Sequence, residues 1–177
     1  MADLATLDAA IRRIPNFPKD GILFYDLTGI LAAPGLLAKT TDSLIDLFPR
    51  DTYDAIVAVE ARGFVFAAPV ADRLGMPLIL LRKPGKLPGA TITESFALEY
   101  GEDRLELQPS DLGSAKRVLL VDDLIATGGT VAAAARLVER AGRDVVGVAA
   151  VVALPFLNYD AALAGRDVRY LIGYDSE

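Results

Sequence analysis

Two adjacent acids, Asp122 and Asp123, separate an apolar run from a small glycine-containing turn in the stretch VLLVDDLIATGGT. Backbone amides at such a strand-to-helix turn, with the positive end of a helix dipole behind them, bind phosphate. The chain contains neither the G-x-x-x-x-G-K-[ST] phosphate loop nor the G-x-G-x-x-G dinucleotide fingerprint. The turn therefore predicts a monophosphate site, built from Ala126, Thr127, Gly128, Gly129 and Thr130.

The two carboxylates need a separate explanation, because they repel each other, they repel phosphate and they resist burial. A tight turn capped by Thr127 is the plainer structural interpretation, but it has no use for the acids. A ribose 5-phosphate uses both features. Its phosphate would lie on the amides of residues 126–130, and its 2′- and 3′-hydroxyls would donate to Asp122 and Asp123. We expect Mg²⁺ nearby, held mainly by substrate oxygens and water rather than by protein side chains alone.

The composition narrows the possible chemistry. The chain has 177 residues, no cysteine and no histidine, which excludes disulfides, thiolate catalysis and the commonest general base. The net charge of −6 argues against a nucleic-acid partner. No apolar run has the length of a membrane span, and the N-terminus lacks a signal-peptide core, so we expect a cytoplasmic protein.

Apolar strands alternate with helices along the chain, which predicts an α/β fold: a doubly wound, mainly parallel sheet flanked by helices. Ligands of such sheets lie beyond the carboxyl ends of the strands. Three polar segments follow strands there: EARG (60–63), RKPGK (82–86) and DDLIATGGT (122–130). The predicted helices are 4–13, 34–48, 64–74, 129–141 and a short one near the C-terminus. The predicted strands are 22–26, 55–59, 77–81, 117–121, 144–154 and 168–174. We expect a long loop over residues 82–95, and a hairpin formed by SFALEY and RLELQ.

The stretch VLLVDDLIATGGT resembles the 5-phosphoribosyl-1-diphosphate (PRPP) signature of the type I phosphoribosyltransferases. The segments FPKDGILFYDLT, VEARGF, RKPGKLPG and LEYG occur in the order seen in the members that use adenine. The resemblance implies transfer of phosphoribose from PRPP to adenine, giving AMP and diphosphate, with Mg²⁺ and in a homodimer. It also implies one domain over 1–177, with a small hood and purine pocket within 1–35 and a mobile hairpin loop.

The same resemblance assigns the diphosphate contacts. Glu60, Ala61 and Arg62 would hold the diphosphate of PRPP, with a non-proline cis peptide between Glu60 and Ala61. For Arg62 the plainer interpretation is a surface salt bridge. Lys83 and Lys86 would neutralise the diphosphate as it leaves, and closing of their mobile loop would exclude water.

The base contacts come from two further segments. Glu99 in LEYG would meet the imidazole edge of the purine and relay the N9 proton, which makes Glu99, Lys86 and Arg62 the expected catalytic set. The adenine pocket would consist of Leu23, Phe24, Tyr25 and Leu154, with Phe24 stacked on the ring and the Leu23 backbone facing the Watson–Crick edge. Tyr25 departs from the pattern, because many adenine-using members carry Arg at that position.

Three other functions remain open at this point. The first is transfer to hypoxanthine, guanine or xanthine, although VVALPFLNYD lacks the Lys that oxo-purine enzymes commonly carry after the signature helix. The second is a PRPP-sensing regulator on the same fold, which the negative charge disfavours. The third is a plain nucleotide-binding domain, which leaves RKPGKLPG and LEYG without a role.

Overall fold

A five-stranded sheet forms the centre of the computed structural model, which describes residues 3–97 and 102–176. Its order is β4-β3-β7-β8-β9, and every neighbouring pair is parallel. The chain order thus reverses between β3 and β7, which is the switch point where doubly wound sheets bind ligands. This confirms the predicted fold class. The strands are β3 (Ala55–Val59), β4 (Leu78–Leu81), β7 (Arg117–Ile125), β8 (Asp144–Ala153) and β9 (Val168–Gly173).

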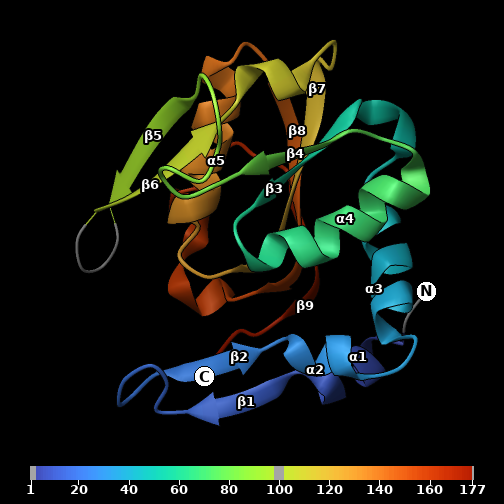
Figure 1. Cartoon of the computed structure of the whole chain (residues 1–177). Coiled ribbons are helices and arrows are strands. Elements are labelled where there is room, and N and C mark those ends of the chain that lie inside the picture. The colour runs from blue at the N-terminus through green and yellow to red at the C-terminus, as the bar shows by residue number, and fades with distance from the viewer. Residues whose placement is uncertain (1–2, 98–101, 177) are drawn as a thin grey trace.

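Helices cover both faces of this sheet (Figure 1). One hydrophobic cluster joins the sheet to α3 (Leu36–Ile45) and α4 (Arg62–Leu74). The other joins it to α5 (Gly129–Arg140) and to the hairpin of β5 and β6. Every residue of β3 is buried, because both of its faces are covered. This is the reason that the strand appears in the sequence as an unbroken apolar run.

The hairpin consists of β5 (Ile92–Ala97) and β6 (Glu102–Leu107). The predicted loop over 82–95 is therefore too long, since β5 already begins at residue 92. Glu94 explains the difference: it pairs with Arg136 and Arg140 of α5, both at 2.7 Å, and fixes this strand on the helix. Glu99 lies outside the described residues.

The N-terminal part forms a separate layer below the sheet in Figure 1, which we call the hood (residues 4–32). It contains α1 (Leu4–Ala10), β1 (Arg12–Pro15), β2 (Leu23–Asp26) and α2 (Thr28–Ala32). The predicted helix over 4–13 is too long, and β1 and α2 were not predicted. Antiparallel pairing of β1 with β2 supplies the backbone hydrogen bonds that a longer helix would have made.

Several boundaries near the carboxyl ends of the strands also differ from prediction. β7 continues through both acids to Ile125 instead of ending at residue 121, and α4 begins at Arg62 instead of residue 64. The α3 helix is shorter than the predicted 34–48. Four 3-10 turns complete the described chain: η1 (Arg50–Thr52), η2 (Pro109–Leu112), η3 (Pro155–Leu157) and η4 (Tyr159–Ala161). Within the described residues, no helix has the length and apolar character of a bilayer span.

Candidate active site

A cavity of about 330 Å³ opens at the switch point between β3 and β7. It is lined by the segments that follow β3 and β4, and by the end of β7 with the turn after it. The predicted PRPP contacts among its lining residues are Glu60, Ala61, Arg62, Lys83, Asp122, Asp123, Ala126, Thr127, Gly128, Gly129 and Thr130. Lys86 is exposed and lies outside this lining, although its N–H donates to the Lys83 carbonyl at 3.3 Å.

The glycine turn presents backbone amides rather than a side chain at the start of α5. The N-cap residue is Gly128, so the interpretation of Thr127 as a helix cap is wrong. Gly128 has a φ of 79°, which favours glycine. A Cβ atom there would lie 3.1 Å from the Tyr159 Cβ and 3.2 Å from the Leu163 Cγ. The turn thus needs glycine for both its conformation and its close packing, and the first amides of α5 are free of a capping side chain.

The acid pair is buried beside this turn. Asp122 is 8% exposed and Asp123 is 5% exposed. Burial, and then repulsion from Asp123, raise the pKa of Asp122 well above its ordinary value. Burial also raises the pKa of Asp123, against the opposing charge of Arg62. A Cβ at Gly63 would lie only 2.8 Å from Asp122 Oδ1, so α4 packs directly on this carboxylate. The pair is costly to ionise unless hydroxyl donors or a cation reach it.

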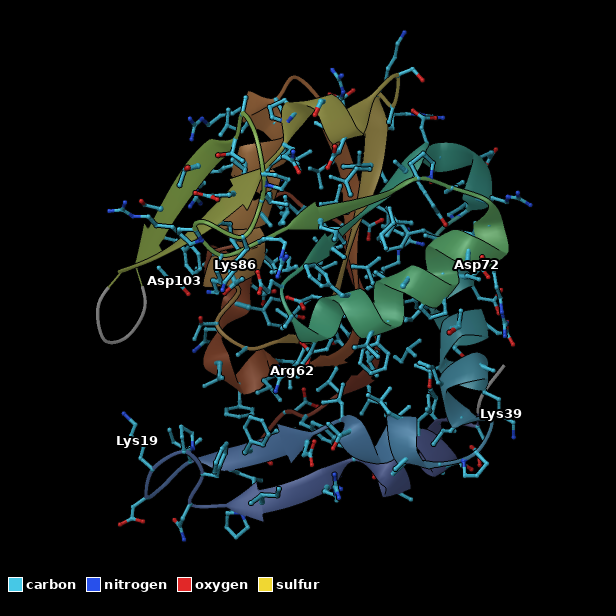
Figure 2. The ribbon with its side chains drawn as sticks, viewed as in Figure 1. Lys19, Lys39, Arg62, Asp72, Lys86 and Asp103 are labelled. Atoms are coloured by element: carbon cyan, nitrogen blue, oxygen red, sulfur yellow. The ribbon has the colours of Figure 1, made fainter. Side chains whose placement is uncertain are left out.

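Arg62 is the cation nearest to the pair. Its Nε lies 2.6 Å from Asp123 Oδ2, and its side chain is 48% exposed. Asp123 Oδ2 has no partner with hydrogen-bond geometry, so the contact is a close charge pairing. Figure 2 shows Arg62 between the sheet and the hood. The partner of Arg62 is a site carboxylate rather than a surface acid, and an incoming diphosphate would compete for the same guanidinium.

Glu60 ties the loop after β3 to the segment after β4. Its carboxylate accepts the Lys83 N–H at 2.8 Å and the Arg82 Nε–H at 3.2 Å. Burial opposes the ionisation of Glu60, but hydrogen bonds from Arg82 and from the Lys83 amide outweigh it and lower its pKa. The Glu60–Ala61 peptide is cis, as predicted.

Lys83 is held by the hairpin. Its Nζ forms an ion pair with Asp103 of β6 and lies 5.8 Å from the centre of the Phe96 ring. Burial opposes the ionisation of Asp103, but the hydrogen bond from Lys83 lowers its pKa. Figure 2 shows Asp103 and Lys86 on the hairpin side of the molecule. Sequence reasoning missed Asp103, because nothing local in the sequence links it to a lysine twenty residues earlier.

The expected adenine contacts divide between two sides of β2. Phe24 packs edge-to-face on Phe17 at 5.0 Å, and its ring lies 5.4 Å from the Arg62 guanidinium. Tyr25 is 3% exposed and stacks on Tyr174 at 4.4 Å. Adjacent strand residues face opposite sides, so Phe24 faces Arg62, which lines the cavity, and the Tyr25 ring faces away; Phe24 itself is not a lining residue. Leu23 is half-buried beside Phe24 on this strand.

Leu154 belongs to the other end of the expected base pocket. It is buried at the end of β8, and its N–H donates to the Ile125 carbonyl at 2.9 Å. This bond fixes Leu154 beside the end of the strand that carries the acids.

The acids alone do not form a metal cage. No group of three or more metal-binding side chains occurs in residues 3–97 and 102–176. The two buried carboxylates with raised pKa values suit a cation whose other ligands come from elsewhere.

Most of the chain that builds this site is matched by the model of a known family. A model described as the phosphoribosyl transferase domain matches residues 28–166. The chain therefore belongs to the phosphoribosyltransferase family. Within it, the chain groups with the adenine phosphoribosyltransferases, as the relatives below establish.

An adenine phosphoribosyltransferase of Treponema denticola is 53% identical over 171 residues, covering 97% of this chain and 90% of the relative. Among solved structures, the enzyme of Thermoanaerobacter pseudethanolicus has a TM-score of 0.92 at 42% identity, covering 97% of this chain and all of the other. The Saccharomyces cerevisiae enzyme, solved with an imino-altritol bisphosphate and adenine, has a TM-score of 0.87 at 38% identity and covers 96% of this chain and 98% of the other.

Proposed function

We propose that this protein transfers the 5-phosphoribosyl group from PRPP to adenine, releasing diphosphate and forming AMP in purine salvage. The observation that carries the proposal is the cavity in which the acid pair, the glycine turn and Arg62 meet. The similarity to adenine phosphoribosyltransferases extends over nearly the whole chain. It favours this activity over transfer to other purines and over a PRPP-sensing regulator.

The chemistry breaks the bond from C1′ to the diphosphate oxygen and forms the bond from C1′ to N9. The chain supplies position and charge rather than a covalent nucleophile. The turn amides of residues 126–130 would hold the 5-phosphate, and Asp122 and Asp123 would accept hydrogen bonds from the ribose hydroxyls. Arg62 and Lys83 would leave their carboxylate partners to stabilise the departing diphosphate. Glu99 would take the N9 proton, with Lys86 assisting at the diphosphate.

Base recognition is assigned to the backbone of β2. The Ile22 carbonyl accepts the Phe17 N–H at 3.2 Å. Ile22 precedes β2, so this bond belongs to the turn that joins the two strands, and the residue of β1 that lies opposite Leu23 is Pro15. Pro15, which lies opposite Leu23, has no N–H to offer. The Leu23 carbonyl thus receives no hydrogen bond from Pro15, and we assign the Leu23 N–H and C=O to the Watson–Crick edge of adenine, with Phe24 stacked on the ring and Leu154 closing the pocket.

Several finer features belong to the same proposal. Mg²⁺ would be held mainly by PRPP and water beside Asp122 and Asp123, where it would neutralise phosphate charge. Residues 1–177 would act as one domain, with 1–35 contributing the purine pocket. A homodimer, a cytoplasmic location and the lack of a nucleic-acid partner stay predictions from the sequence.

Product formation tests the proposed function. The purified protein, incubated with labelled adenine, PRPP and Mg²⁺, is expected to give AMP and diphosphate in a ratio of one to one. Omission of PRPP is the control. Persistence of free adenine under these conditions, in a protein that is folded by circular dichroism, would reject the proposal.

The connection between β4 and β5 is expected to change its dynamics on binding. The N–H groups of Lys83 and Gly85 donate to Glu60 and Glu106, whereas the tether of residues 87–91 is the bond from Gln108 to the Pro88 carbonyl. We expect fast hydrogen exchange there in the free protein and protection when a PRPP analogue and Mg²⁺ are bound. Residues 92–97, fixed on α5 through Glu94, are expected to exchange more slowly in both states. Slow exchange of residues 87–91 in the free protein would contradict this.

A further inference from the structure

Tyr174, just beyond β9, contacts three elements of the hood. Its ring stacks on Tyr25 of β2, with 4.4 Å between ring centres and 13° between planes. Its hydroxyl donates to Asp8 Oδ1 of α1 at 2.6 Å. The Arg13 guanidinium of β1 lies 5.0 Å from the centre of the same ring. One side chain from the end of the chain thus joins the N-terminal helix and both strands of the hood.

The backbone of Tyr174 is fixed to the central sheet. Its N–H donates to the Ala153 carbonyl at the end of β8, at 3.1 Å. Leu154, which follows Ala153, donates its N–H to the Ile125 carbonyl at the end of β7. The position of Tyr174 is therefore set by the strands that carry the active site, and the side chain transmits this position to the hood.

The polar part of the contact is strong for a half-exposed site. The hydrogen bond from Tyr174 is the main cause of the lowered pKa of Asp8, and Arg13 pairs with the same carboxylate at 2.7 Å. Burial, and then the bond to Asp8, raise the pKa of Tyr174. A neutral phenol that donates to an ionised carboxylate makes a charge-assisted hydrogen bond, which is stronger than a neutral one.

The contact has a direct geometric consequence for the base. Tyr25 and Phe24 are neighbours on β2 and face opposite sides, so a rotation of the strand that moves the Tyr25 ring also moves the Phe24 ring. Tyr25 is paired across the hairpin with Arg13, which also contacts Tyr174. Both members of this cross-strand pair are therefore held by one tyrosine.

We propose that Tyr174 is a positioning residue for adenine: it holds β2 against the sheet so that Phe24 and the Leu23 backbone meet the base. This rests on the proposed function, since it assumes that β2 binds the purine. Tyr174 does not line the cavity assigned to PRPP. Loss of the Tyr174 side chain is thus expected to weaken the binding of adenine and to leave the binding of PRPP unchanged.

Steady-state kinetics with both substrates tests this inference. Tyr174→Leu removes the stack and the hydrogen bond, and we expect the KM for adenine to rise about tenfold while kcat and the KM for PRPP stay within about twofold. Tyr174→Phe keeps the stack and loses only the hydroxyl, so its KM for adenine is expected to rise about threefold, less than in Tyr174→Leu but above that of the control variant. Tyr170→Phe is the matched control, because it removes a tyrosine hydroxyl from β9, where Tyr170 packs against the other hydrophobic cluster.

The outcomes separate this inference from the proposed function. A wild-type protein that forms no AMP would reject the function itself. An active wild type whose Tyr174→Leu variant raises both KM values equally, or loses kcat and melting temperature with an unchanged KM for adenine, would overturn the positioning role. If Tyr174→Leu fails to fold, Tyr174→Phe decides: a KM for adenine indistinguishable from that of Tyr170→Phe would overturn it.

Discussion

Replacing Asp122 and Asp123 together by asparagine is expected to weaken PRPP binding by about a hundredfold while the fold stays intact. Each carboxylate would lose a charge-assisted hydrogen bond from a ribose hydroxyl, and such bonds contribute about 1.5–3 kcal/mol. Asparagine retains an oxygen acceptor, so the Asp123 N–H, which donates to Asp122 Oδ1 at 2.8 Å, keeps a partner.

The same double variant is expected to be at least as stable as the wild type at neutral pH. Both carboxyls have raised pKa values in the folded protein. Their contribution to the stability of the folded state is therefore fully present below the ordinary pKa of 3.8, and it is lost as the pH rises through the pKa values of the folded protein. The stability gain of the asparagine variant should therefore grow with pH. Arg62, half-exposed, can turn to solvent when its partner loses charge.

Calorimetric titration with PRPP and Mg²⁺ measures the loss of affinity. Thermal melting between about pH 4 and pH 8, roughly the range over which a raised carboxyl titrates, measures the change in stability. The control is Asp72→Asn, an exposed acid on α4 remote from Arg62 (Figure 2). Wild-type PRPP affinity in the double variant would contradict the assignment of the acids to the ribose.

Phe24→Ala is expected to raise the KM for adenine by about ten- to a hundredfold, because stacking of a base on an aromatic ring contributes about 1–3 kcal/mol. Tyr25→Phe is the matched comparison. Its ring keeps the stack on Tyr174 and faces away from Phe24, so we expect the KM for adenine to change by about twofold or less.

The preference for adenine is expected to survive in Tyr25→Phe. Initial rates with adenine and with hypoxanthine, for the wild type and for Tyr25→Phe, measure this. An increased preference for hypoxanthine in Tyr25→Phe would show that this side chain, rather than the β2 backbone, reads the base.

Much of the fold and of the candidate site could be predicted from the sequence, for a physical reason. Strands buried on both faces are apolar throughout, so β3 was predicted with its observed bounds. Ligands of doubly wound sheets lie at the carboxyl ends of the strands. The segments EARG and DDLIATGGT could therefore be assigned to one cavity, in which the structure places them.

The remaining features depend on contacts between residues far apart in the chain. β1 forms because β2 pairs with it, and residue 92 starts β5 because Glu94 meets two arginines of α5. The pairing of Lys83 with Asp103 and the stacking of Tyr25 on Tyr174 have no local signal either. The sequence shows which residues can form ion pairs or aromatic stacks, but only the fold determines which partners they meet.

The measurement that tests the central claim most directly is kcat/KM for adenine, hypoxanthine, guanine and xanthine, each with saturating PRPP and Mg²⁺. Adenine presents a donor at C6 and an acceptor at N1, whereas the oxo-purines present the reverse. Two mismatched buried groups cost about 1–3 kcal/mol each, so adenine should exceed the others by about a hundredfold or more. A comparable kcat/KM for any of the other three bases would contradict the assignment.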